Sequence, residues 1–205
     1  MPAPPDELLP EPARSPAGGG ELGAAVHAAL AQPGDVLAEF RRLAALAALD
    51  PSAGEDMLRR WLAHPLSRAP SLGVEVEFNL RLGGVRLKGV VDLICELGGQ
   101  TALVDYKTNA RLDSRLREAY SLQLRLYGLA AGEGLLPGGR EPRLYLFDLR
   151  RGEAIEVSPD PEAARLRVQA AARAIAEARF ELGPEHADRP CRLCAYRTIC
   201  PDRRE

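Results

Sequence analysis

An acid and a lysine stand two residues apart at the end of an apolar run. Residues 102–104 (ALV) are typical of a buried strand, and Asp105 and Lys107 follow directly. Side chains at positions i and i+2 of a strand share a face, so these two are expected side by side. A second acid, Asp92, interrupts the apolar stretch GVVDLI at 89–94. A carboxylate in such a run is costly unless it has a partner.

A divalent cation would explain two acids on neighbouring strands. Close carboxylates repel each other and raise each other's pKa, and a bound Mg²⁺ or Mn²⁺ removes that penalty because both ions prefer oxygen ligands. Such an ion lowers the pKa of a bound water and polarises a phosphoryl oxygen. Lys107 beside it could orient and help to deprotonate the attacking water. In the structural alternative, Asp92 caps a turn and Asp105 pairs with an arginine.

Lysine is scarce in this chain. Among its 27 basic side chains, only Lys88 and Lys107 are lysines. Arginine therefore serves wherever a cation suffices, and a retained lysine can be one that is needed as a compact ammonium. The alternative is an ordinary surface ion pair, which contributes little.

The hydrophobic pattern predicts the elements that hold these residues. Helical periodicity indicates helices at 21–32, 35–50, 54–66, 113–131 and 160–180, and alternation indicates strands at 74–82, 85–97, 101–108 and 142–150. Glycine pairs at 83–84 and 98–99 predict turns between the first three strands, and 150–153 predicts another turn. The core order αβββαβ predicts an α/β fold with a mixed central sheet flanked by helices. The helix before the last strand allows a right-handed crossover.

Composition narrows the class of protein. The 205 residues suit one domain with a tail, and a hydrophobic fraction of 46% excludes a mostly disordered chain. The net charge of −2 provides no global basic field, although a local basic patch remains possible. Residues 1–20 are rich in proline and glycine and are expected to be a disordered leader or linker; they lack the features of a signal peptide. No apolar run is long enough to span a membrane, so a cytoplasmic protein is expected.

The two acidic strands together resemble a known family. GVVDLI followed by ALVDYKTN is similar to the signature of RecB-type nucleases in the PD-(D/E)xK superfamily. GELGAAVHAAL resembles the opening helix of that family, VEVEF its first strand, and QLRLY its Gln-x-x-x-Tyr motif. The resemblance covers roughly residues 21–200. It implies a restriction-endonuclease-like core and metal-dependent hydrolysis of phosphodiesters.

The resemblance also implies roles for the matching residues. Asp92 and Asp105 would ligate the metal, with the Tyr106 carbonyl as a further ligand, and Lys107 would act on the nucleophilic water. His27 would lie close to the metal, as a ligand or beside one.

Three more positions match the family motifs. Glu75 would assist the placement of metal or substrate, with Glu77 as the alternate acid. Gln123 and Tyr127, one helical turn apart, would contact the DNA strand or brace Lys107. Without the resemblance, the alternatives are that His27 is a satisfied core histidine and that Gln123 and Tyr127 are a pair on a helix surface.

Three cysteines near the C-terminus have the spacing of metal ligands. Cys191, Cys194 and Cys200 form C-x2-C-x5-C in a tail that spans 184–205. AddB-type and CRISPR adaptation nucleases hold a [4Fe–4S] cluster here, with a fourth cysteine upstream of the opening helix. Residues 1–90 contain no cysteine, and Cys95 on a core strand is expected to be a buried small hydrophobe. The alternatives are a zinc site completed by His186, a cluster with a non-cysteine ligand, or a ligand from sequence outside this chain.

These observations predict a divalent-metal-dependent DNA nuclease, with an exonuclease on single-stranded ends favoured. It would act in repair or recombination, alone or beside a helicase, because the chain has no phosphate-binding glycine-rich lysine motif of its own. The alternatives are a catalytically silent DNA-binding or scaffold module of a helicase–nuclease complex, and a metal-binding structural domain.

Overall fold

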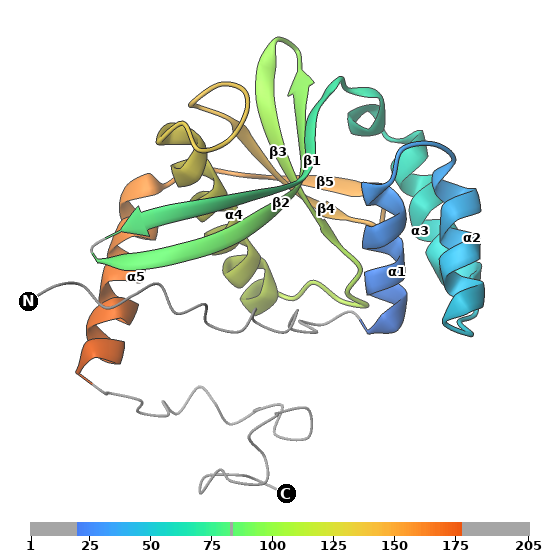
Figure 1. Ribbon diagram of the computed structural model, residues 1–205, viewed down its shortest axis with the longest axis horizontal. Coiled ribbons are helices and arrows are strands. Elements are labelled where there is room, and N and C mark those ends of the chain that lie inside the picture. Colours follow the sequence, from blue (N-terminus) through green and yellow to red (C-terminus); the bar gives the residue numbers. More distant parts are fainter. Residues whose placement is uncertain (1–19, 83, 178–205) are drawn as a thin grey trace, which may run out of the picture.

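The computed structural model describes residues 20–82 and 84–177, which form one sheet with helices on both faces (Figure 1). The strands are β1 (Ser71–Leu82), β2 (Val85–Leu97), β3 (Gln100–Lys107), β4 (Arg143–Asp148) and β5 (Glu153–Val157). The helices are α1 (Glu21–Ala31), α2 (Val36–Leu46), α3 (Ser52–Ala63), α4 (Ser114–Gly132) and α5 (Pro161–Ala176), with a 3₁₀ helix at Pro65–Arg68. None of these helices combines the length and the apolar character that crossing a bilayer requires.

The sheet is mixed, as the sequence predicts. Its order is β1-β2-β3-β4-β5: the first three strands form an antiparallel meander, β3 and β4 are parallel, and β4 and β5 are antiparallel. Helix α4 connects the two parallel strands. Strand β5 was not predicted: the sequence pattern indicated a turn at 150–153 and no strand after it. Its five residues contain two glutamates, so the strand pattern is too short and too polar to stand out in the sequence.

Each face of the sheet has its own apolar core. On one side, Leu103 packs with residues of α4 and α5, including Leu124 and Val168. On the other, Val104 and Tyr106 pack against α1, α2 and α3. The alternation along β3 therefore places its odd-numbered residues toward α4. Cys95 is fully buried in the second core, which confirms the expectation of a small buried hydrophobe.

Strand β2 leaves β3 halfway along its length. The two strands pair from Leu97–Gln100 only as far as Leu93–Val104, whereas β2 stays paired with β1 to the end of their hairpin. The distal half of this hairpin therefore projects away from the rest of the sheet (Figure 1). At the fork, the Tyr106 N–H faces the departing strand, and the Asp92 side chain accepts its hydrogen bond at 2.7 Å. Asp92 thus satisfies a backbone donor that would otherwise lack its ladder partner.

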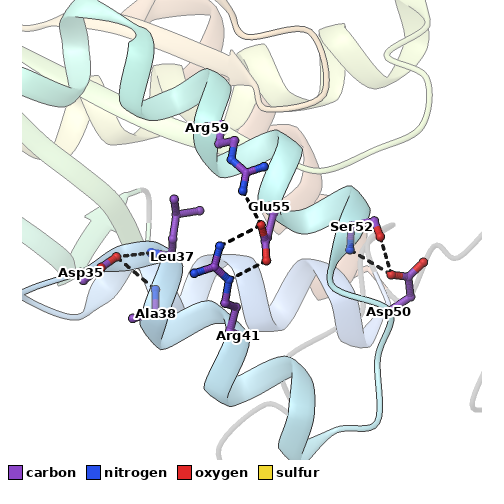
Figure 2. A network of polar contacts seen from close by, with 8 residues as sticks. All are labelled: Asp35, Leu37, Ala38, Arg41, Asp50, Ser52, Glu55 and Arg59. Atoms are coloured by element: carbon purple, nitrogen blue, oxygen red, sulfur yellow. Dashed lines mark hydrogen bonds and ion pairs between the residues drawn. The ribbon is translucent and has the colours of Figure 1, made fainter.

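Helices α2 and α3 are joined by a charged network (Figure 2). Glu55 accepts hydrogen bonds from Arg41 at 2.7 and 3.1 Å and from Arg59 at 2.6 Å. Beneath this network, Gly54 packs directly against the ring of Phe40, leaving no room for a methyl group. The close approach of the two helices therefore depends on a glycine in the first turns of α3.

We expect Gly54→Ala to lower the free energy of unfolding by about 1–3 kcal/mol, because the added methyl group overlaps the Phe40 ring. Chemical denaturation measures this loss. Gly132→Ala is the matched control: its methyl group would meet only the Arg140 carbonyl oxygen, at 3.8 Å, so it should be at least as stable as the parent. An unchanged stability for Gly54→Ala would contradict the packing described here.

Candidate active site

Three carboxylates come together where β2 leaves β3. Glu75 lies between two residues of β1 that pair with the neighbours of Asp92 on β2. Asp92 and Asp105 each lie one residue beyond the last β2–β3 pair, Leu93 with Val104. The three acids therefore form a row across three adjacent strands, since directly opposed residues of paired strands are neighbours.

A histidine from α1 completes a possible metal site with two of these acids. One ligand atom each from His27, Glu75 and Asp92 lie within 4.8 Å of one another. His27 Nδ1 lies 3.5 Å from Asp92 Oδ1. Two carboxylates and an imidazole are a donor set that suits a divalent cation such as Mn²⁺, and the carboxylates also suit Mg²⁺. The residues present therefore fit the predicted ion.

The arrangement distinguishes between the two candidate acids of β1. Glu75 lies in this cluster, whereas Glu77 pairs with Lys88 across the hairpin at 3.3 Å. Glu75 has a backbone φ of +49°, in the left-handed region that residues other than glycine rarely adopt. Such a conformation costs of order 1–3 kcal/mol and recurs at functional sites. Nothing in the sequence around Glu75 signals it.

Asp105 lies deeper than the other acids and faces Lys107. Its side chain is almost completely buried, and its Oδ2 lies 2.5 Å from Lys107 Nζ. Burial raises the pKa of Asp105 to about 6, helped by the Asp92 charge and opposed by the Lys107 ammonium. Oδ2 accepts no hydrogen bond of good geometry, so the contact with Lys107 is chiefly an ion pair. The structural alternative of an Asp105–arginine pair is not what the structure shows.

Helix α4 holds the lysine from the other side. Lys107 Nζ donates to Gln123 Oε1 at 3.2 Å, and Gln123 Nε2 donates to the Tyr127 hydroxyl at 2.5 Å. The ring of Tyr120 lies under the ammonium, 4.1 Å from Nζ to its centroid. Of the two roles considered for Gln123 and Tyr127, this geometry is the one expected for bracing Lys107. Tyr120 was not among the predicted site residues, although it lies one helical turn before Gln123 and that spacing was a usable signal.

His27 owes its position to a close helix contact. Gly23, one turn earlier on α1, packs against Thr108, where a Cβ would lie 2.7 Å from the threonine hydroxyl oxygen. Burial lowers the pKa of His27, but the hydrogen bond and charge of Asp92 outweigh it, so that the pKa is raised. The ring also meets Tyr106 edge to face, with centroids 6.0 Å apart. Tyr106 itself points its side chain into the core beneath α1 and α3.

The segment after β3 is fixed by the loop that follows β4. Leu149 N–H donates to the Lys107 carbonyl at 3.0 Å, and Arg150 Nε donates to the Thr108 carbonyl at 2.8 Å. These contacts set the chain direction immediately past the lysine. Arg150 was not predicted from the sequence, because its contact joins residues 42 positions apart.

Some predictions lie outside the described residues. They are residues 1–19 of the leader predicted at 1–20, the cysteines Cys191, Cys194 and Cys200, and the alternative zinc ligand His186. The tail metal and the boundaries of the leader and tail therefore stay predictions.

Comparisons with known proteins bear on the fold and the family. The sequence matches the family described as "PD-(D/E)XK nuclease superfamily" over residues 6–201. A solved structure from Eubacterium rectale, described as a "putative exonuclease", is similar with a TM-score of 0.59 and 15% identity, over 90% of this chain and 75% of that one. A second structure, SSO0001, has a TM-score of 0.47 and 16% identity, over 90% of this chain and 96% of that one. No match was found among curated proteins.

At 15% identity, the first structure supports the fold alone. The second has too low a TM-score to support any conclusion about this chain. The family match spans nearly the whole sequence, and the mixed sheet flanked by helices is the restriction-endonuclease-like core that the sequence predicts. The narrower RecB-type, AddB-like or CRISPR-associated assignment stays a prediction. The chain belongs to the PD-(D/E)XK nuclease superfamily.

Proposed function

We propose that this chain is a divalent-metal-dependent deoxyribonuclease that hydrolyses phosphodiesters as an exonuclease on single-stranded ends. One observation carries the proposal: the ion pair between the buried Asp105 and the partly buried Lys107 lies at the same fork as the His27, Glu75 and Asp92 cluster. The family supports nuclease activity, and the description of the Eubacterium rectale structure supports an exonuclease. Single-strand preference, a repair role, a helicase partner and a cytoplasmic location belong to the proposal.

The proposed roles follow from the contacts. His27, Glu75 and Asp92 would hold the cation, with Asp105 and the Tyr106 carbonyl as further candidate ligands. When bound, that ion lowers the pKa of a water and polarises a phosphoryl oxygen.

Lys107 would orient the attacking water and offset the charge that develops on the phosphate. Gln123 and Tyr120 fix its ammonium in place, so that little reorganisation is needed during the reaction.

A catalytically silent DNA-binding or scaffold module is the second candidate. Such a module has no need of an ammonium held by an acid, an amide and an aromatic ring, and ordering these groups costs free energy. DNA binding without cleavage, under every divalent metal tried, would favour the silent module.

We expect Lys107→Ala to lower kcat at least about a hundredfold on single-stranded DNA with Mg²⁺ or Mn²⁺, because the group that orients the water is lost. Lys107→Arg should fail similarly, because a planar guanidinium cannot occupy the place of an ammonium between Gln123 and Tyr120. Gel assays of end-labelled DNA measure the rate.

Lys88→Ala is the control for this series. Lys88 is the only lysine besides Lys107, and it pairs with Glu77 on the hairpin, away from the proposed reaction. It should keep the parent kcat on a minimal phosphodiester such as bis(p-nitrophenyl) phosphate. Thermal unfolding establishes that each variant is folded. Near-parental rates for Lys107→Arg would show that the assigned role is wrong.

We expect Asp92→Asn and Glu75→Gln each to weaken Mn²⁺ binding by at least about tenfold in calorimetric titration, because each removes a charged ligand. In Asp92→Asn the side-chain amide still offers an oxygen to the Tyr106 N–H, which limits damage to the fold. Glu77→Gln is the matched control and should bind like the parent, since Glu77 pairs with Lys88. Equal affinity in all four proteins would remove the cluster from the metal site.

The tail cysteines are proposed to hold a metal, with a [4Fe–4S] cluster favoured over zinc. After anaerobic purification, we expect a visible charge-transfer band that oxidation abolishes, and Cys194→Ser should lose the metal and unfold at lower temperature. A colourless protein with one zinc would indicate the site with Cys191, Cys194, Cys200 and His186 instead. A parent protein without any tail metal would contradict both alternatives.

A further inference from the structure

The projecting half of the β1–β2 hairpin has one apolar and one charged face. Leu80, Leu82 and Leu87 point toward the core beneath α4 and α5. The alternating positions, which include Arg81 and Arg86, are exposed on the opposite face. That opposite face lies on the same side of the sheet as α1, α2 and α3, which stop short of the hairpin tip (Figure 1).

Two arginines oppose each other near the tip. Arg81 and Arg86 are direct cross-strand partners, and both are exposed. Like charges directly opposite one another destabilise an antiparallel pair. Neither guanidinium has an ion-pair or hydrogen-bond partner among residues 20–82 and 84–177.

Several other basic side chains of the described fold are paired with acids. Arg41 pairs with Glu55, Arg143 with Glu156 and Arg165 with Glu133, and Lys88 next to the arginine pair is neutralised by Glu77. The Arg81–Arg86 pair therefore keeps two uncompensated positive charges on a protein whose net charge is −2. A pair of guanidiniums side by side suits an anion with several oxygens, and a phosphate is the anion that guanidinium geometry matches.

We propose that Arg81 and Arg86 clamp a backbone phosphate of the nucleic-acid substrate and guide the strand along the hairpin into the fork. This inference rests on the proposed nuclease function. Asp92 follows Arg86 by six positions on β2, a distance of about 20 Å along an extended strand. The clamp would therefore hold the strand several nucleotides away from the site of cleavage. The charged face and the His27 ligand lie on the same side of the sheet.

Binding tests the clamp without depending on cleavage. The full chain carrying Lys107→Ala, with Mg²⁺ at constant concentration, is titrated into a labelled single strand of about 20 nucleotides, which is long enough to reach both places. Adding Arg81→Gln with Arg86→Gln should raise Kd roughly tenfold at low salt and reduce the slope of log K against log salt by about 0.7, the share of one neutralised phosphate on a single strand. Arg68→Gln with Arg167→Gln is the charge-matched control, because it also removes two exposed arginines; it should keep the parent slope.

Activity separates the clamp from the chemistry. In chains that retain Lys107, the Arg81→Gln, Arg86→Gln variant should hydrolyse bis(p-nitrophenyl) phosphate at the parent rate, because this diester cannot reach the hairpin. On the longer strand its KM should rise roughly tenfold at low salt while kcat stays close to the parent value. Its thermal stability should be unchanged or higher, because a like-charge pair has been removed. A lower stability would mark the pair as structural and overturn the proposal.

Each failure has its own signature. If the hairpin variant binds DNA with the parent affinity and salt slope, the clamp is wrong even when the parent cleaves DNA. If the parent cleaves neither DNA nor the minimal diester with any divalent metal, the proposed nuclease function fails. In that case, a smaller salt slope for the hairpin variant than for the parent would still identify the clamp as a phosphate-binding element. If the control variant loses as much affinity as the hairpin variant, only overall charge matters and the clamp is overturned.

Discussion

The departure of β2 from β3 at Asp92 is the constraint on which the rest of the site depends. A sheet that splits leaves backbone donors without partners, and here the Asp92 carboxylate accepts from Tyr106 in place of the lost ladder. At the same split, Glu75, Asp92 and Asp105 occupy neighbouring positions on three adjacent strands. One side chain therefore both stabilises the fork and offers an oxygen to whatever binds there.

The fork also separates two electrostatic environments. Asp105 is buried beside Lys107 on the α4 side, where removing the ammonium would leave the carboxylate unpaired in the interior. Glu75 and His27 lie nearer the surface, on the side of α1. The buried pair holds the ammonium in position, and the outer residues can exchange ions with solvent. The two sets meet at Asp92, whose charge acts on both His27 and Asp105.

Local rules explain how far the sequence predicted this arrangement. The spacing of Asp105 and Lys107 on a strand, and of Gln123 and Tyr127 on a helix, depends only on the period of each element, so both pairs could be read directly. The position of His27 beside the acids depends on the packing of α1 against Thr108, and the choice of Glu75 over Glu77 depends on strand register. Local rules give neither, so both predictions came from the family resemblance. Arg150 was missed because its role arises from a contact between distant segments, and β5 because its local pattern is weak. Tyr120 was missed although its helical spacing from Gln123 could have indicated it.

The three residues suited to hold an ion come from three elements, α1, β1 and β2. Strand β1 is at the edge of the sheet and α1 packs on its face, whereas β3, which carries the lysine, is central. Edge strands and peripheral helices commonly open locally at lower free energy than a central strand, and such opening is visible in amide hydrogen exchange. A ligand that binds only the closed form slows that opening in proportion to its occupancy. Metal concentration would thus control how often the first helix leaves the sheet, while the strand that carries the lysine stays protected.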